Sequence, residues 1–179
     1  MKKFVSGFIC ALSLFYFLSF EWFPDFPLPK FVLNEKKCPF CTTEVIANQT
    51  VFSGEHVRVL YNFKPMLEGH VLLTPIRHVE RFEDLSSDEL GEIGILSKKV
   101  HKAFVKAYGK EDYVLVLQNG YLGGQTVPHT HFHMIPRGKK DSTIKTKALF
   151  WNTVFSEIIG TRNPLSNEEI QIEIQKLRH

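Results

Sequence analysis

The pattern of apolar and polar positions predicts two strands early in the folded part of the chain. Residues 56–62 alternate, with Val57, Val59 and Tyr61 on one face, which is the two-residue period of a strand. A second apolar run, residues 70–74, follows a segment that contains proline and glycine. Because such residues interrupt a strand, we expect the two runs to pair as a hairpin with a long loop.

Two helices are predicted, and each begins at a capping box. Ser86 precedes Glu89 by three residues, and apolar residues then recur at helical spacing until Gly109. Ser166 and Glu169 repeat the same signal near the C-terminus, where apolar residues again follow at helical intervals as far as residue 178. The chain is therefore expected to contain a main helix and a C-terminal helix.

Two further strands are expected between the helices. Residues 113–117 read as a short buried strand, residues 120–124 as a turn, and residues 129–135 as a strand whose odd-numbered positions share a face. The order strand, strand, helix, strand, strand, with hairpins and one central helix, predicts an α+β domain on an antiparallel sheet.

The N-terminal segment differs from the rest. Lys2 and Lys3 precede a run without charge over residues 4–20, a pattern typical of a secretory signal or a membrane anchor. The run is at the short limit for a span, which needs ~20 residues. A hydrophobic extension with no membrane role is the alternative. If the run spans a membrane, Lys2 and Lys3 before it and Glu21 and Asp25 after it favour an N-terminus inside and the folded part outside the cytoplasm.

Composition narrows the class of protein. The chain has 179 residues, of which 44% are hydrophobic and 23% charged, values typical of a globular domain. A formal net charge of +3 argues against a broad basic surface for nucleic acid. Three cysteines cannot build a scaffold of several disulfides, so the fold must rest on an apolar core.

Three histidines carry the first candidate chemistry. His129, His131 and His133 lie two residues apart in a predicted strand, so their side chains project from one face. Imidazoles make a poor core face because each needs hydrogen-bond partners when buried. They suit chemistry that needs a nucleophile, an acid and a ligand near neutral pH. A solvated polar face and a metal site alone are the alternatives.

A pair of cysteines carries the second candidate chemistry. Cys38 and Cys41 form a C-x-x-C pattern, which is found in redox dithiols and in zinc knuckles. No thioredoxin-like strand–helix–strand pattern surrounds them. A zinc ion needs four nitrogen or sulfur ligands, so two more would have to come from elsewhere in the chain. A reduced, unliganded thiol pair is the alternative.

Residues 124–135 (GQTVPHTHFHMI) resemble the signature of the histidine triad (HIT) superfamily, with Thr130 as the one departure from its apolar positions. Asn62, residues 69–72, residues 77–85 and Gln118 are similar to the fragile histidine triad branch. The resemblance implies an antiparallel sheet of about five strands with one main helix and a C-terminal helix. It also implies a homodimer and a hydrolase that cleaves dinucleoside polyphosphates, such as diadenosine tri- or tetraphosphate, at the α-phosphate through a nucleotidyl-histidine.

The resemblance also implies roles for individual residues. His131 would be the nucleophile, His133 and Gln118 would contact phosphate or leaving-group oxygens, and His70 would support the nucleophile's surroundings. A glycine turn would bind the α-phosphate through backbone N–H groups, and Asn62 would contact the ribose; for Asn62 and Gln118, satisfying turn backbone is the alternative. The predicted catalytic residues are His131, His133, Gln118 and His70, and the predicted nucleotide-binding residues are Asn62, Gly124, Gln125 and Thr126.

Other branches of the superfamily are similar to this chain at the cysteine pair, and they imply a structural Zn²⁺. Those branches complete the site with a histidine after the second strand and with the first histidine of the motif. If His129 binds zinc, it cannot shuttle protons, so hydrolysis would depend on His131, His133 and Gln118. The predicted zinc ligands are Cys38, Cys41, His78 and His129.

The expected organisation follows from these assignments. A signal- or anchor-like segment (1–21) and a proline-rich linker (22–35) precede a HIT catalytic domain (36–140) and a C-terminal extension with a helix (141–179). The expected partners are a nucleoside polyphosphate and a second copy of the chain, with membrane association through residues 4–20 and no nucleic acid. For the location of the protein, two alternatives are considered: a cytoplasmic-type enzyme, or one that is anchored to a membrane or exported through the N-terminal segment. An adenosine phosphoramidase, a nucleotide-binding or signalling protein with weak turnover, and a zinc-stabilised structural module are the alternative functions.

Overall fold

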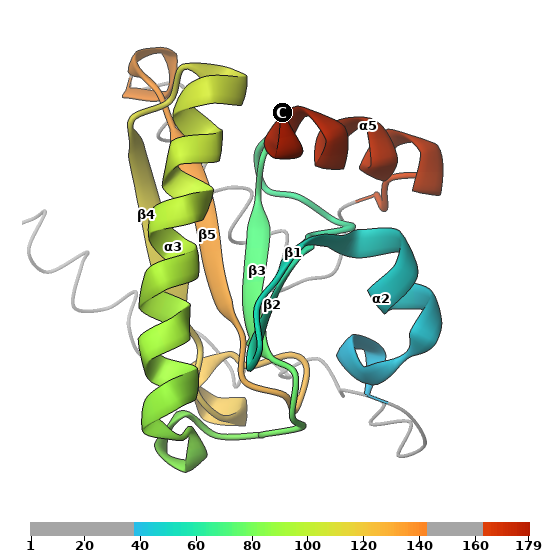
Figure 1. Cartoon of the computed structure of the whole chain (residues 1–179), viewed down its shortest axis with the longest axis vertical. Coiled ribbons are helices and arrows are strands. Elements are labelled where there is room, and N and C mark those ends of the chain that lie inside the picture. The colour runs from blue at the N-terminus through green and yellow to red at the C-terminus, as the bar shows by residue number, and fades with distance from the viewer. Residues whose placement is uncertain (1–37, 143–162) are drawn as a thin grey trace, which may run out of the picture. The chain divides into compact units, whose positions relative to one another are not determined.

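The computed structural model describes residues 38–142 and 163–179 and has an antiparallel sheet in the order β1-β2-β3-β5-β4 (Figure 1). The strands are β1 (Thr50–Ser53), β2 (Val57–Tyr61), β3 (Val71–Pro75), β4 (Asp112–Leu117) and β5 (Phe132–Arg137). The helices are α2 (Thr43–Gln49), α3 (Ser87–Tyr108) and α5 (Asn167–Arg178), with short 3₁₀ turns η1 (Pro39–Cys41), η2 (Phe82–Asp84), η3 (Tyr121–Gly123) and η4 (Lys139–Ser142). The α+β fold with five strands, a main helix and a C-terminal helix is confirmed.

Both long helices begin where the sequence predicts. The Ser86 side chain accepts a hydrogen bond from the Glu89 backbone N–H, and the Glu89 side chain accepts one from the Ser86 N–H. Gly109 closes α3 in the left-handed conformation (φ +62°), which glycine adopts without steric cost. Ser166 and Glu169 form the same reciprocal pair at the start of α5. These signals are local in sequence, and they fix the start of both helices and the C-terminal end of α3.

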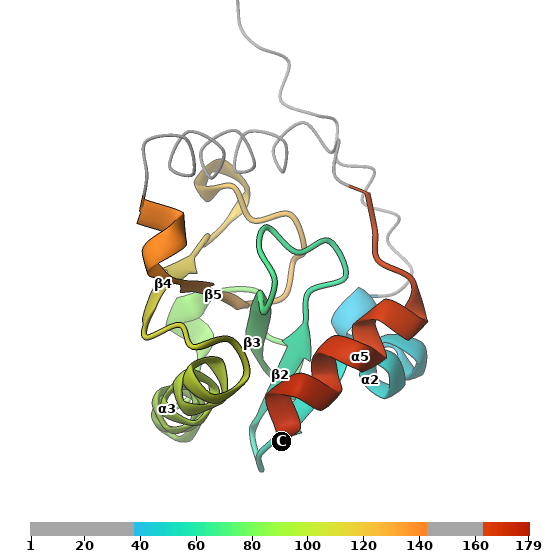
Figure 2. The same ribbon diagram turned by 90° about the horizontal axis from the view of Figure 1, so that it is seen from above.

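The sheet has an apolar core on one face and the histidines on the other. Val57, Val59 and Tyr61 are buried in the main core, together with residues of α3 and α5, which lie on the same side of the sheet (Figure 2). Leu60 alternates with those positions, and together with Leu72, its partner on β3, it packs on the opposite face against Phe40 of η1. The alternation read from residues 56–62 is therefore confirmed, and it leaves the second face for the site.

Two short elements, α2 and β1, are not predicted by the sequence. The helix α2 has only two turns and no buried residue, so its apolar positions show no helical stripe. In β1 a single residue, Val51, is buried, which is too little for an alternating pattern. Both elements owe their form to neighbours, since β1 pairs with β2 and α2 contacts α5.

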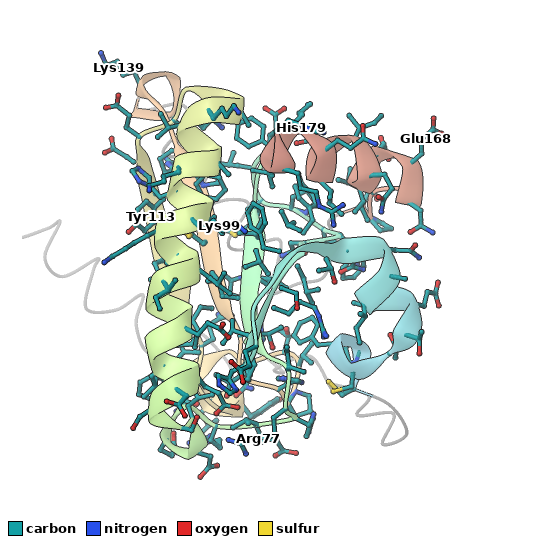
Figure 3. All side chains as sticks on the ribbon, viewed as in Figure 1. Arg77, Lys99, Tyr113, Lys139, Glu168 and His179 are labelled. Atoms are coloured by element: carbon teal, nitrogen blue, oxygen red, sulfur yellow. The ribbon has the colours of Figure 1, made fainter. Side chains whose placement is uncertain are left out.

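The strand expected to be buried at residues 113–117 is exposed. It forms β4 at the edge of the sheet, where Tyr113, Leu115 and Val116 are 42–44% exposed, and Tyr113 lies at the outer side next to α3 (Figure 3). A continuous apolar run predicts burial only if another layer covers it. The described residues provide no strand beyond β4, so the prediction of burial within one chain is wrong.

No helix within residues 38–142 and 163–179 is both long and apolar enough to cross a membrane. This finding goes against the expected membrane anchorage or export, and we withdraw that expectation. The apolar run 4–20 and the linker 22–35 lie outside the described residues, as does part of the expected extension, residues 143–162.

Candidate active site

The histidine-bearing strand begins later than predicted. β5 starts at Phe132, so His133 pairs in register with Leu72 of β3 and Val116 of β4. His129 and His131 precede it, because the Thr130 N–H donates to the carbonyl of Val79 (2.6 Å) in the loop after β3. The expected row of three rings is therefore divided. The rings of His131 and His133 lie 4.9 Å apart, whereas the His129 ring meets the two cysteines.

His131 is held as a neutral imidazole. Its Nδ1 lies 2.8 Å from the carbonyl oxygen of His129, and a carbonyl can only accept, so Nδ1 carries the proton and Nε2 keeps its lone pair. Burial lowers the pKa of His131, and the hydrogen bond to His129 only partly opposes this. The rings of Phe40 and His131 pack in a T-shaped arrangement, with 5.2 Å between their centroids. Nε2 therefore has the chemistry of a nucleophile near neutral pH.

His133 and His70 form a buried pair. His70 Nε2 lies 3.0 Å from His133 Nδ1, and the backbone N–H of Met66 donates to His70 Nδ1 at 3.1 Å. Asn62 lies next to this pair, with its Nδ2 3.4 Å from the His70 ring nitrogens and its Oδ1 accepting from the Lys64 N–H. The structure thus brings together Asn62 and His70, from the two ends of the loop between β2 and β3, and His133 from β5.

The glycine turn lies against Gln118, but its donors are largely used within the turn. Gly124 has φ +88°, and a Cβ there would meet Gln118 Nε2 at 2.7 Å, so only glycine fits without a shift. The N–H groups of Gly124 and Gln125 donate to the carbonyls of Tyr121 and Gly120. These two N–H groups are therefore already used within the turn. Thr126, which is partly buried, is the predicted residue whose N–H takes no part in these turn bonds.

The side chain of Gln125 holds the turn together. It is buried, its Oε1 accepts from the Gly120 N–H at 2.6 Å, and its Nε2 donates to the carbonyls of Glu80 and Val127 at 2.9 Å. These contacts connect the turn to the loop after β3 and to the approach to His129. The structure places Gln125 as a support of the turn, not as a side chain presented to a nucleotide.

The four predicted metal ligands come together at the edge of this face. Their ligand atoms, from Cys38, Cys41, His78 and His129, lie within 4.8 Å of one another. Three sulfur–nitrogen distances are 3.3, 3.5 and 3.6 Å, and zinc bonds of ~2.3 Å to sulfur and ~2.0 Å to nitrogen place a sulfur and a nitrogen ligand about 3.5 Å apart in a tetrahedral site. His129 Nε2 donates to the Pro75 carbonyl (3.0 Å), which leaves Nδ1 for the metal.

The donor set also has suitable acid–base chemistry. Burial, and next the hydrogen bond and charge of Cys41, raise the pKa of the Cys38 thiol to about 11, whereas burial lowers the pKa of His129 to about 4. The imidazole is therefore neutral, as a ligand must be, and the thiol must lose its proton when a metal binds. Two thiolates and two imidazoles are a typical ligand set for structural zinc, and zinc binding here is expected to release protons from the cysteines.

Thr130 leads to a prediction about stability. It is 1% exposed, and within the described part of the chain its hydroxyl has no hydrogen-bond partner, whereas the nearby Thr74 hydroxyl donates to the Thr130 carbonyl at 2.9 Å. Thr130→Val removes an unsatisfied buried hydroxyl at nearly constant volume. We expect the free energy of unfolding to rise by about 1 kcal/mol and Tm by about 3 °C in thermal unfolding. Thr74→Val, the matched control, should lower both, and a lower Tm for Thr130→Val would contradict the argument.

Comparisons with known proteins agree with this geometry. The family model described as "HIT domain" matches residues 43–140. The bis(5'-adenosyl)-triphosphatase of Dictyostelium discoideum is 32% identical over 131 residues, which cover 73% of this chain and 84% of that protein. The asymmetrical bis(5'-nucleosyl)-tetraphosphatase of Schizosaccharomyces pombe is 36% identical over 96 residues, 54% of this chain and 53% of that protein.

A solved structure shows the same fold. The crystal structure of the NitFhit protein of Caenorhabditis elegans is similar with a TM-score of 0.58 and 31% identity, and the match covers 74% of this chain and 27% of that chain. In sequence, the nitrilase and fragile histidine triad fusion protein NitFhit is 32% identical over 146 residues, so the present chain spans about a third of its length.

Proposed function

This chain belongs to the histidine triad (HIT) family, and from that premise we propose that it hydrolyses dinucleoside polyphosphates through a nucleotidyl intermediate on His131. The resemblance stated from residues 124–135 is thereby confirmed at the level of the family. The observation that carries the proposal is the fixed protonation of His131, whose Nδ1–H is bound to the His129 carbonyl and whose Nε2 keeps a lone pair. The catalytic domain is proposed to span residues 36–140.

The reaction is proposed to proceed in two displacements. In the first, His131 Nε2 forms a bond to the α-phosphorus while the bond to the bridging oxygen breaks and the leaving nucleotide takes that electron pair. The His131–His129 hydrogen bond stabilises the imidazolium that results. In the second, water attacks the phosphorus and gives up one proton to the solvent, the phosphorus–nitrogen bond breaks with its electron pair returning to His131 Nε2, and AMP leaves as the imidazole returns to its neutral form.

Other residues bind the substrate in this proposal. His133 and Gln118 hydrogen-bond phosphate or leaving-group oxygens, and Asn62 contacts the ribose. Gly124 allows the phosphate to approach the backbone, and Thr126 supplies an N–H group. Gln125 acts indirectly, because its buried side chain fixes the turn that carries Gly124.

A structural zinc is proposed at Cys38, Cys41, His78 and His129. When bound, zinc supplies a covalent cross-link among these four side chains, and because all four positions are protein ligands it offers none to substrate. Fixing His129 also fixes the carbonyl that holds His131 Nδ1. Phe40 lies between the two cysteines and packs its ring edge on His131, so the knuckle touches the nucleophile directly.

A homodimer is proposed at the edge strand β4. Tyr113, Leu115 and Val116 are exposed there, and an exposed apolar edge is a surface that a second strand covers. Leu115→Glu with Val116→Glu is expected to convert a dimer to a monomer in light scattering, because the two charges would have to be buried at the edge. Ile172→Glu, at an exposed apolar position of α5, should leave the assembly unchanged, and a dimeric double variant would contradict the proposed edge.

Substrate comparison tests the proposed activity. We expect kcat/KM for diadenosine triphosphate to exceed that for adenosine phosphoramidate by at least about 100-fold, a difference of about 2.7 kcal/mol in transition-state binding. The products are measured by chromatography as AMP and ADP. Preference for the phosphoramidate would favour the adenosine phosphoramidase alternative. Nucleotide affinity with no turnover on either compound would identify a binding protein instead.

A further inference from the structure

The loop between β2 and β3, residues 62–70, brings a backbone amide against the buried histidine pair. The N–H of Met66 points at His70 Nδ1, 3.1 Å away, and His70 Nε2 lies 3.0 Å from His133 Nδ1. His70 is fully buried and His133 nearly so. The Met66 N–H, the His70 ring and the His133 ring therefore form one continuous chain of hydrogen bonds. The chain starts at a backbone N–H, which can donate a hydrogen bond but cannot accept one.

The direction of every bond in this chain follows from that donor. A backbone N–H only donates, so His70 Nδ1 must be the unprotonated nitrogen and Nε2 must carry the ring proton. His70 Nε2–H then donates to His133 Nδ1, which leaves the ring proton of His133 on Nε2. A cationic His70 is disfavoured by the same contact, because Nδ1–H would face the Met66 N–H.

We propose that the Met66 backbone N–H and His70 are positioning groups that keep the proton of His133 on Nε2, where it donates a hydrogen bond to a substrate oxygen. This proposal rests on the proposed function for the role of His133. It assigns His70 a different task from the catalytic one predicted from sequence. His70 does not touch the substrate and transfers no proton; it fixes which nitrogen of His133 is the donor.

The loop that carries Met66 is braced from the other face of the sheet by the C-terminal segment. From that segment the Leu165 N–H donates to the Phe63 carbonyl at 2.8 Å, and Lys176 pairs with Glu68 at 3.1 Å. From β2, the Tyr61 hydroxyl accepts from the Gly69 N–H at 3.2 Å. These contacts hold the loop near both of its ends.

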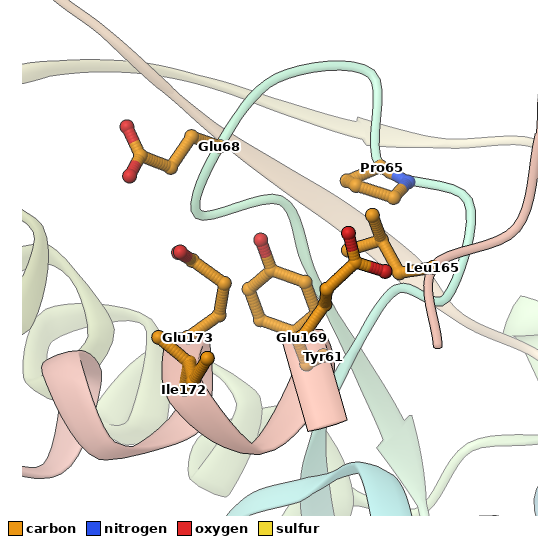
Figure 4. A pocket seen from close by; sticks show the side chains of 7 residues that line it. All are labelled: Tyr61, Pro65, Glu68, Leu165, Glu169, Ile172 and Glu173. Carbon is orange, nitrogen blue, oxygen red and sulfur yellow. The ribbon is translucent and has the colours of Figure 1, made fainter. Parts of the chain in front are cut away.

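Between them lies a cavity of about 320 Å³ that Glu68, Tyr61 and Glu173 help to line, with the Tyr61 hydroxyl pointing into it (Figure 4). No predicted site residue lines it. Pro65 and Glu68, which lie before and after Met66 in the loop, line this cavity. The contacts above connect Leu165 and α5 to the loop that carries the Met66 N–H.

Two matched pairs of variants test the inference in the full-length chain. Met66→Pro removes the N–H, whereas Met66→Ala keeps it. His70→Leu removes the donor to His133, whereas His70→Gln retains an amide N–H that can reach His133 Nδ1 and an oxygen that can accept from Met66. The readout is the ¹⁵N chemical shift of the His133 ring nitrogens, which separates a protonated from an unprotonated nitrogen.

The expected result is a proton on Nε2 of His133 in the parent, Met66→Ala and His70→Gln proteins, and a mixture of both tautomers in Met66→Pro and His70→Leu. In kinetics, kcat for diadenosine triphosphate should fall about ten-fold from His70→Gln to His70→Leu, the effect of one buried hydrogen bond. A nucleotide ester with a nitrophenyl leaving group, whose oxygen carries less charge, should show a smaller difference.

A proton on Nδ1 of His133 in the parent protein would overturn the inference. So would identical ring shifts in Met66→Pro and Met66→Ala, or, if the proline variant does not fold, in the two His70 variants. Because the ¹⁵N shifts need no turnover, this failure is distinct from failure of the proposed function, which would appear as a parent protein that cleaves no dinucleotide.

Discussion

Replacing His131 by alanine is expected to lower kcat for dinucleoside polyphosphate hydrolysis by at least about 10⁴-fold, the scale of losing a covalent nucleophile. No other group can replace it without rearrangement, because the proposed attack depends on one ring nitrogen held unprotonated by the His129 carbonyl. Affinity for the nucleotide should change much less, since phosphate and ribose contacts come from other residues. Single-turnover kinetics with excess protein measures the chemical step directly.

The control for this variant is His101→Ala, which removes a partly exposed histidine of α3 that is not part of the site. It should keep the parent's rate. His131→Ala should keep the parent's zinc content and sheet signature in circular dichroism, so that lost activity is not lost fold. A rate within ten-fold of the parent would mean that His131 is not the nucleophile.

Replacing His78 by alanine is expected to remove the metal and to lower the free energy of unfolding by at least about 3 kcal/mol, as loss of a structural metal does. The side chain of His78 is 43% exposed, so its removal costs little packing, and a large effect must come through the metal. Zinc in the purified protein should fall from near one equivalent to a small fraction. The measurements are elemental analysis and denaturant unfolding.

Activity is expected to fall with the metal because His129 loses its anchor, and its carbonyl and Phe40 both position His131. His179→Ala, at the exposed C-terminus, is the control and should change neither zinc nor stability. Cys41→Ser should reproduce the effect of His78→Ala. If His78→Ala unfolds like the parent and retains its metal, the four-residue site is wrong.

The parts of the fold that local patterns specify could be predicted from the sequence. Both capping boxes and the alternation of Val57, Val59 and Tyr61 are found in the structure as expected. The exposure of β4 could not be predicted, because an apolar run does not say which layer covers it. The late start of β5 depends on a bond between Thr130 and Val79, residues far apart in sequence.

The residues of the site were more predictable than their tasks. The structure brings together the four residues expected to bind zinc, and it places His70 next to His133. The groups that set the protonation of the site are backbone atoms, such as the Met66 N–H and the His129 carbonyl, and backbone atoms have no signature in sequence. Gln125, by contrast, is part of the sequence motif, but its side chain hydrogen-bonds the backbone of its own turn.

The central claim is a covalent bond between one imidazole and the α-phosphorus, and trapping that adduct tests it most directly. The parent protein is mixed with diadenosine triphosphate, quenched within one turnover and digested under conditions that preserve phosphorus–nitrogen bonds. Mass spectrometry is then expected to find one adenylyl group, on His131, and none in the His131→Ala protein. An adenylyl group on a different residue, or hydrolysis at the parent's rate without His131, would contradict the account.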